Sequence, residues 1–156
     1  MSDRFKNRYR SDSMRHPRWD YTFPGCYFIT IVTHQRVPFF GYIHNGVMVP
    51  NEAGRVVEEV WLEIPCQFDD TTVDAFVVMP DHVHGIIMLW DFEPAAGGSP
   101  CGGEYPRQAG GITGVHNPMI TAHSIGKIVR WFKGKSSYRV RRVPGFQGFG
   151  WQTRFY

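Results

Sequence analysis

The sequence predicts an α+β fold, a ferredoxin-like split β-α-β sandwich in which an antiparallel sheet carries helices on one face. Two observations support this prediction. Apolar runs typical of strands occur before and after a segment with helical spacing, and a second segment with helical spacing follows near the end of the chain. The resulting order is strand, hairpin, helix, strand, strand, helix, strand. With 156 residues, the chain has the size of one ordinary domain.

The first half of the chain predicts a strand, a hairpin and a helix. Residues 25–33 are rich in β-branched and aromatic residues, as a buried strand is. Residues 42–49 contain Asn45 and Gly46 between apolar flanks, a pair that favours a tight hairpin turn. Asn51 can cap the helix that follows, and Pro65 is expected to end it.

Two further strands are predicted over residues 71–79 and 83–90, with a turn at Pro80 and Asp81 between them. Residues 91–118 are rich in Gly and Pro, which indicates a long surface loop. The next helix has one apolar face, formed by Ile125, Ile128, Val129 and Phe132.

The two ends of the chain complete the domain plan. After a glycine-rich stretch, residues 151–156 are expected to begin one more strand. Residues 1–20 show little apolar periodicity and are expected to form a flexible basic arm, so that residues 21–156 make up the domain.

Charge is distributed unevenly along the chain. Residues 105–156 contain nine Lys or Arg and no Asp or Glu, and residues 1–18 contain six against two. Residues 19–104 contain two against twelve. Clustered Lys and Arg are typical of proteins that bind a polyanion, because they displace counterions from phosphates. A solvated helix face and a basic arm would produce the same pattern without a partner.

The sequence lacks features of exported or membrane proteins. It has no apolar run of the roughly 18 residues that a membrane helix needs, and its first residues are polar and basic. We therefore expect a cytoplasmic protein that does not bind a membrane. Cys26, Cys66 and Cys101 are odd in number and far apart, so we expect them to be reduced.

His82 and His84 are the strongest candidates for chemistry. Side chains two apart on a strand project from the same face, so both imidazoles can reach one metal ion. The intervening Val83 would then face the core, and Gly85 leaves room beside the pair. Spacing alone is a weak signal, since two surface histidines often occur this close by chance.

Their context resembles the single-tyrosine HUH transposases, and in particular the REP-associated tyrosine transposases of bacteria. The segment from Asp74 to Gly85, which ends in Met-Pro-Asp-His-Val-His-Gly, carries the most specific match. Further matches, in chain order, are Pro24 to Thr30, Phe40-Gly41, Asn51 to Gly54, Ile128 to Lys133 and Trp151 to Tyr156. The resemblance covers most of the chain.

This resemblance implies DNA transposition: the cleavage and rejoining of single-stranded DNA, often beside a folded hairpin, through a covalent phosphotyrosine. His82 and His84 would hold a divalent metal, with Mg²⁺ or Mn²⁺ as the family expectation. The basic second helix would contact the DNA backbone. On this basis the expected DNA-binding residues are Lys127, Arg130, Lys133, Lys135, Arg139, Arg141 and Arg142.

The sequence departs from the family pattern at the nucleophile. In the family the catalytic tyrosine lies on a helix beyond the strand that here ends at Tyr156, together with a further metal ligand. Tyr156 aligns with a strand-end aromatic, and Tyr138 matches no nucleophile position. We therefore expect a C-terminally truncated chain without a catalytic residue of its own. Apolar surface exposed by the missing helix would favour self-association as a homodimer.

Two other interpretations stay open at this point. One is a DNA-binding remnant that grips a hairpin or a single strand without cutting it. The other is an unrelated metal-dependent hydrolase that uses His82 and His84 with a carboxylate such as Asp74 or Asp81. The hydrolase interpretation leaves the separated basic charge unexplained. Asp81 could instead orient a metal-bound histidine.

Overall fold

An antiparallel sheet of three strands lies at the centre of the structure. The structure is a computed structural model that describes residues 4–5, 8–9, 21–90 and 124–153. The strands are β3 (Gly25–Val32), β6 (Thr71–Met79) and β7 (His82–Leu89), in the order β3-β7-β6. Since β7 is hydrogen-bonded on both sides, it is the most firmly held strand of the sheet.

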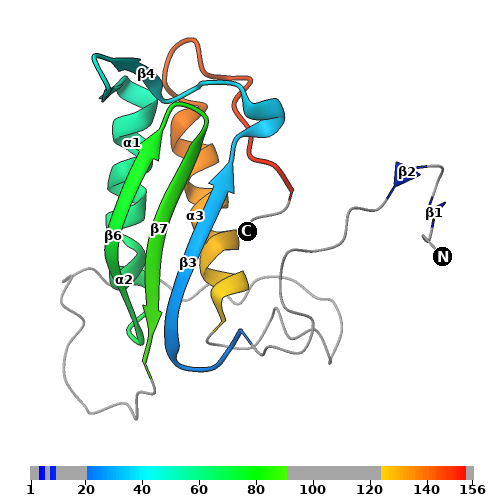
Figure 1. The fold of residues 1–156 in the computed structure, drawn as a ribbon, viewed down its shortest axis with the longest axis vertical. Coiled ribbons are helices and arrows are strands. Elements are labelled where there is room, and N and C mark those ends of the chain that lie inside the picture. Colours follow the sequence, from blue (N-terminus) through cyan, green and yellow to red (C-terminus); the bar gives the residue numbers. More distant parts are fainter. Residues whose placement is uncertain (1–3, 6–7, 10–20, 91–123, 154–156) are drawn as a thin grey trace.

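Two long helices cover one face of this sheet (Figure 1). They are α1 (Glu52–Leu62) and α3 (Ile125–Val140), which contact each other side by side. The short α2 (Ile64–Gln67) follows α1 and contacts β6. The described part of the chain is therefore an α+β sandwich of an antiparallel sheet with helices on one face, as the sequence predicts.

Several smaller elements complete the described part of the chain. A short 3₁₀ turn, η1 (His34–Arg36), follows β3, and the hairpin β4 (Gly41–His44) and β5 (Val47–Pro50) precedes α1. Two two-residue strands near the start of the chain, β1 (Arg4–Phe5) and β2 (Arg8–Tyr9), pair with each other.

The core lies between the sheet and the helices, because each element buries the face that its sequence period predicts. Every second residue of β7 is buried, and the large buried side chains of the helices include Trp61 and Phe132. Their rings meet edge to face at 5.3 Å. Such aromatic contacts add about 0.5–1.5 kcal/mol to the free energy gained from area burial alone. The helix layer and β7 are thus fixed to each other.

Local signals in the sequence explain where several elements begin. Asn51 caps α1, since its side-chain oxygen accepts a hydrogen bond from the backbone N–H of Gly54 at 3.0 Å. Asn45 and Gly46 both have positive φ, 49° and 77°, as the predicted tight hairpin turn requires. Pro65 lies in the first turn of α2, where its missing N–H costs nothing, and α1 ends at Leu62.

The last predicted strand differs from expectation. Within the described residues, Trp151 forms a single antiparallel bridge to Thr33, and residues 154–156 are outside the description. A glycine-rich approach to this segment gives few side chains that could pack along a continuous ladder. The predicted loop over residues 91–118 and most of the predicted arm over residues 1–20 also lie outside the described residues.

Candidate functional site

The side chains on the two faces of β7 differ in polarity and burial. Val83 and Gly85 point to the helix layer and are buried, whereas His82 and His84 point to the opposite side of the sheet and are partly exposed. The two histidines come from the central strand, so their backbone is held by β3 and β6 together. This confirms the predicted placement of both imidazoles on one face.

The two imidazole rings are close enough to share a ligand. Their centroids lie 4.5 Å apart and their planes are inclined at 75°. With a nitrogen–metal bond of about 2.1 Å and about 1.1 Å more to each ring centre, the two centres would lie about 4.5 Å apart for a nitrogen–metal–nitrogen angle of about 90° and about 5.2 Å apart for a tetrahedral angle. The separation of the rings is therefore short enough for His82 and His84 to share one metal ion.

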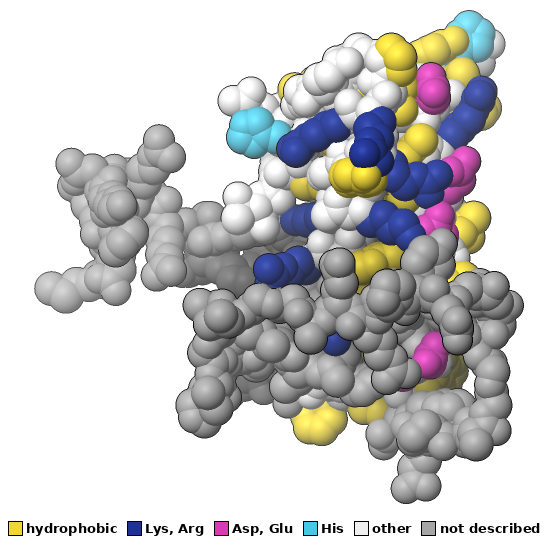
Figure 2. Space-filling model, turned by 180° about the vertical axis from the view of Figure 1, so that it is seen from behind, with side chains coloured by type: hydrophobic (Ala, Val, Ile, Leu, Met, Phe, Trp, Pro, Cys, Tyr) yellow, Lys and Arg dark blue, Asp and Glu magenta, His cyan; other side chains and the backbone are white. Residues whose placement is uncertain are grey.

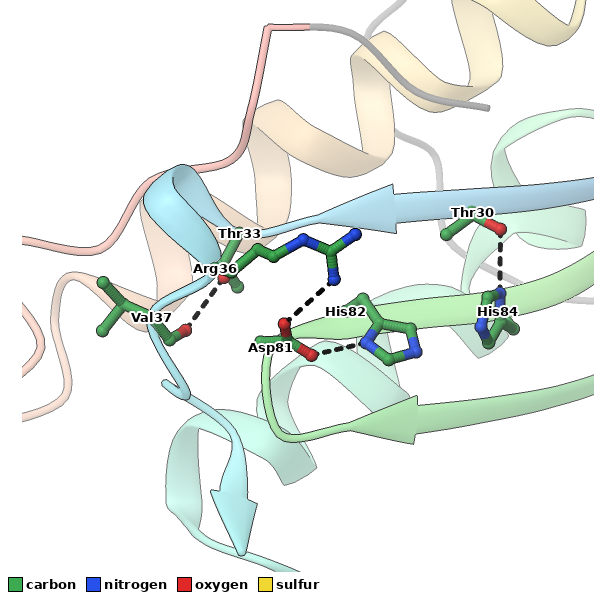
Figure 3. A network of polar contacts seen from close by, with 7 residues as sticks. All are labelled: Thr30, Thr33, Arg36, Val37, Asp81, His82 and His84. Atoms are coloured by element: carbon green, nitrogen blue, oxygen red, sulfur yellow. Dashed lines mark hydrogen bonds and ion pairs between the residues drawn. The ribbon is translucent and has the colours of Figure 1, made fainter. Parts of the chain in front are cut away.

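Hydrogen bonds fix the orientation of both rings (Figure 3). Nδ1 of His82 lies 2.5 Å from Oδ1 of Asp81, and Nδ1 of His84 lies 2.8 Å from Oγ1 of Thr30. Thr30 is the cross-strand partner of His84 in the sheet, so this second contact follows from the register. With Nδ1–H as the donor in both bonds, each Nε2 keeps its lone pair for a metal.

Asp81 connects the histidine pair to a basic side chain. Its Oδ2 lies 3.4 Å from Nη1 of Arg36, in the turn after β3. Burial by itself would raise the pKa of the Asp81 carboxyl, but the hydrogen bond and charge of His82, with the charge of Arg36, lower this pKa below its ordinary value. Asp81 is therefore an ionised acceptor that can hold His82 at neutral pH.

His84 is kept neutral by its surroundings. Burial lowers the pKa of His84, and the neighbouring charge of His82 lowers it further. The ring of Phe28 stacks on His84 at a centroid distance of 5.4 Å while remaining 66% exposed. Because the neutral imidazole is the form that binds metals, a lowered pKa of His84 favours ligation.

The basic residues predicted to bind DNA lie on the other side of the sheet. Five of the seven belong to α3, and Arg141 and Arg142 follow directly after it. Figure 2 shows Lys and Arg side chains gathered over the helix layer. The predicted metal ligands and the predicted DNA-binding residues therefore occupy opposite faces of the fold, which the linear sequence did not reveal.

Several of these cations are engaged within the protein. Arg139 donates to both Glu59 and Glu63, and Lys135 lies 2.5 Å from a second oxygen of Glu63. These ion pairs tie α3 to the end of α1. They also partly neutralise the positive charges of Lys135 and Arg139. Lys133 donates to the carbonyl of Gln152 at 2.8 Å.

The other members of the predicted set are more open. Lys127, Arg130, Arg141 and Arg142 are exposed. The guanidinium of Arg142 lies 3.7 Å from the ring centroid of Tyr138, also exposed, and Arg141 donates through Nε to the carbonyl of Phe149 at 2.8 Å. An exposed aromatic beside an arginine is suited to base stacking as well as to phosphate contact. The open part of the basic surface is therefore centred on the exposed side of α3 and its C-terminal end.

Comparison with known proteins identifies a relative of this chain. An uncharacterized protein of Haemophilus influenzae (strain Rd) is 35% identical over 146 residues, which cover 92% of this chain and 75% of the relative. The chain belongs to the family of this protein. No known protein-family profile matches the chain.

Two solved structures resemble the fold, each with a TM-score of 0.48 over 92% of this chain. The first is a presumed transposase from Deinococcus radiodurans R1, 19% identical and covered over 83% of its length. The second is a REP-associated tyrosine transposase bound to a REP hairpin, 15% identical and covered over 60% of its length. A TM-score of this size does not establish a shared function.

The described residues of this chain do not place a third protein ligand beside the two histidines. Among those residues, no group of three His, Cys, Asp or Glu side chains is placed to hold a metal ion. Asp81 is engaged by the Nδ1 of His82, and Asp74 is an exposed residue at the irregularity in β6. The set of three protein ligands that a hydrolase of the alternative type would use is therefore not assembled there.

Tyr138 does not lie on the same face of the sheet as the histidine pair. Tyr138 projects from α3, on the helix side of the sheet, and its ring is covered by Arg142. Tyr138 is 58% exposed, so it is a surface residue of α3. Tyr156 is outside the described residues.

Two further expectations concern membranes and cysteines. No helix in the described ranges is long and apolar enough to span a bilayer. The expectation of reduced cysteines is wrong for Cys66, which is disulfide-bonded, whereas Cys26 is a free, exposed thiol. Separation along the chain does not limit how close two residues come in space, so spacing was a poor guide here.

Proposed function

We propose that this chain is a transposase-type protein that binds single-stranded or hairpin DNA and takes part in its metal-dependent cleavage and rejoining. The observation that carries the proposal is the pair His82 and His84 on one face of β7, with both Nδ1 atoms held by contacts to Asp81 and Thr30. This pair lies within the segment whose sequence resembles the HUH transposases most specifically.

The protein's own contribution is to hold two imidazoles in fixed orientations. Asp81 contacts Nδ1 of His82 and Thr30 contacts Nδ1 of His84, and with Nδ1–H as the donor in both bonds neither ring has to reorganise when a metal binds. A divalent ion held there would neutralise charge on a scissile phosphate. Imidazole ligands suit Mn²⁺ better than Mg²⁺, which prefers oxygen, so we expect Mn²⁺ to bind more tightly to the protein alone.

The exposed cations of α3 would grip DNA at a distance from this centre. Because the two faces are separated by the sheet, a strand bound by both must pass around an edge of the domain. A folded hairpin held on the helix layer, with its single-stranded extension reaching the histidines, fits this arrangement. The metal-dependent step would then act on the single strand alone.

Cleavage of a labelled hairpin DNA with a single-stranded extension, in Mn²⁺ or Mg²⁺, tests the proposal. Metal-dependent nicking with a covalent protein–DNA product, both lost in the variant that combines His82→Ala and His84→Ala, would support the cleavage part of the proposal. It would also show that a tyrosine within these 156 residues is the nucleophile, against the expectation from the sequence. His44→Ala is the matched control, because His44 is an exposed histidine of the β4–β5 hairpin outside the pair. DNA binding without any metal-dependent nick would refute the cleavage part of the proposal.

We also propose that the protein self-associates as a homodimer and works in the cytoplasm. Exposed apolar side chains on the histidine face, among them Phe28 and Val77, support self-association. Sedimentation velocity at several concentrations tests this, and a monomer throughout would refute it.

A further inference from the structure

The turn after β3 brings an arginine to the histidine face. We infer that Arg36 is a phosphate-binding residue, which contacts a non-bridging oxygen of a DNA backbone lying beside His82 and His84. The inference rests on the proposed binding of single-stranded DNA. Arg36 is not part of the basic helix surface and does not belong to a recognisable motif of the sequence.

The fold holds this turn in one place. The backbone N–H of Thr33 donates to the carbonyl of Asp81 at 2.9 Å, and its hydroxyl donates to the carbonyl of Val37 at 2.8 Å. Arg36 therefore starts from a backbone that is tied directly to the loop preceding His82. Figure 3 shows its side chain reaching toward Asp81, beside His82.

The backbone of this turn is strained. Gln35 and Arg36 are consecutive non-glycine residues with φ of 55°, a conformation that costs about 1–3 kcal/mol for each residue. The ion pair with Asp81 does not offset this cost, since Arg36 is 68% exposed and such pairs contribute about 0–1 kcal/mol. The hydrogen bonds of the turn hold this backbone, and the weak ion pair leaves the Arg36 guanidinium available for another partner.

The guanidinium has donors to spare. Arginine carries five N–H donors, and the contact with Asp81 uses one nitrogen at the long distance of 3.4 Å. An exposed, planar guanidinium matches the oxygens of a phosphate and remains charged at any pH of interest. A phosphate near the histidine pair would therefore find donors that are already positioned.

Charge balance at this face supports the same assignment. Asp81 brings a negative charge beside His82, which would repel a DNA phosphate. Arg36 offsets that charge. Among the described residues, it is the basic side chain that contacts Asp81. The cations of α3 lie on the other side of the sheet and cannot take its place.

The experiment measures binding of the labelled hairpin DNA by fluorescence anisotropy over a series of salt concentrations. We expect Arg36→Ala to weaken binding roughly tenfold, the loss typical of a hydrogen bond to a charged group. The slope of log affinity against log salt should fall by about 0.7, as for one single-strand phosphate contact. Arg36→Lys should keep most of the slope.

Gln35→Ala is the matched control, because Gln35 is the exposed neighbour of Arg36 in the same turn and carries no charge. DNA with a single methylphosphonate linkage, moved along the extension, locates the contact. At one position we expect the neutral linkage to weaken binding by the wild-type protein and not by Arg36→Ala. Equal affinities of the wild-type protein and Arg36→Ala would overturn the inference and leave the proposed function intact.

Two further outcomes are decisive. If the wild-type protein does not bind the DNA, the proposed function fails and the inference fails with it. If Arg36→Ala weakens Mn²⁺ binding as much as Asp81→Asn does, Arg36 acts through Asp81 and is not a phosphate contact. We expect Mn²⁺ affinity, measured by electron paramagnetic resonance, to change less than twofold in Arg36→Ala.

Discussion

Gly85 of β7 lies directly against the indole of Trp61 in α1. A Cβ placed on Gly85 would stand 2.2 Å from Cζ2 of Trp61, far inside contact distance. Trp61 is fully buried and cannot move aside, because its ring packs against Phe76 and Phe132. The strand that carries the histidines therefore approaches the helix layer as closely as a backbone can.

We expect Gly85→Ala to destabilise the protein by about 1–3 kcal/mol, the usual cost of overpacking a filled core. Urea unfolding followed by tryptophan fluorescence measures this change. Gly134→Ala is the control, since a Cβ there meets nothing within 4 Å and the helix should gain up to about 1 kcal/mol. Unchanged stability in Gly85→Ala would mean that β7 and α1 can separate without cost.

The lowered pKa of His84 gives a second prediction. In the metal-free protein, NMR titration should place the pKa of His84 below its ordinary value of 6.5. Phe28→Ala should raise it toward 6.5, because removal of the stacked ring reduces the burial that lowers it. No change in Phe28→Ala would show that other neighbours bury His84.

The same shift predicts how stability depends on pH. The unfolded chain takes up a proton at His84 near pH 6.5, before the folded chain does. The neutral ring's contribution to stability is therefore fully present above pH 6.5 and is lost as the pH falls from 6.5 through the lower folded-state pKa. Denaturant unfolding of the wild-type protein and His84→Gln across this range measures it; equal slopes would contradict the assignment.

The hydrogen bonds to Nδ1 predict the strength of the metal site. Asp81→Asn should lower Mn²⁺ affinity by about 10–100-fold, and Thr30→Val should lower it by a smaller factor, because both groups orient a ligand without touching the metal. Calorimetric titration measures these affinities. Thr72→Val is the control: Thr72 accepts from Trp90 near the far end of the sheet. Equal losses in all three variants would indicate general disturbance of the sheet.

The cations of the helix layer should differ in their effect on DNA binding. Arg130→Ala and Arg142→Ala remove exposed charges and should each weaken binding and reduce its salt dependence. Arg139→Ala should affect DNA binding less, since Glu59 and Glu63 already bind its guanidinium. It should instead destabilise the contact between α1 and α3 by up to about 1 kcal/mol. Equal effects of all three on affinity would contradict this ranking.

The fold was largely accessible from the sequence because its signals are local. The period of the apolar residues and the cap at Asn51 depend on residues a few positions apart, and the structure follows them closely. The final strand was less predictable, since the pairing of Trp151 with Thr33 joins residues far apart in the chain.

The candidate site was accessible in part. The spacing of His82 and His84 fixes their common face, whatever the rest of the fold does. The roles of Thr30 and Arg36 depend on strand register and on a strained turn, and neither leaves a mark in the sequence. Density of charge identified α3 as basic, but it could not show that Glu59 and Glu63 neutralise part of that surface.

The alternation along β7 has a consequence for how this gene can change over generations. Substitutions at Val83 and Gly85 are tested first by whether the protein folds, because these positions face the helix layer. Substitutions at His82 and His84 leave that packing intact and, on the proposed function, are tested by metal binding. Selection therefore acts separately on the two alternating sets of positions in β7. A lineage that no longer needs the proposed reaction would lose His82 and His84 but keep Val83 and Gly85.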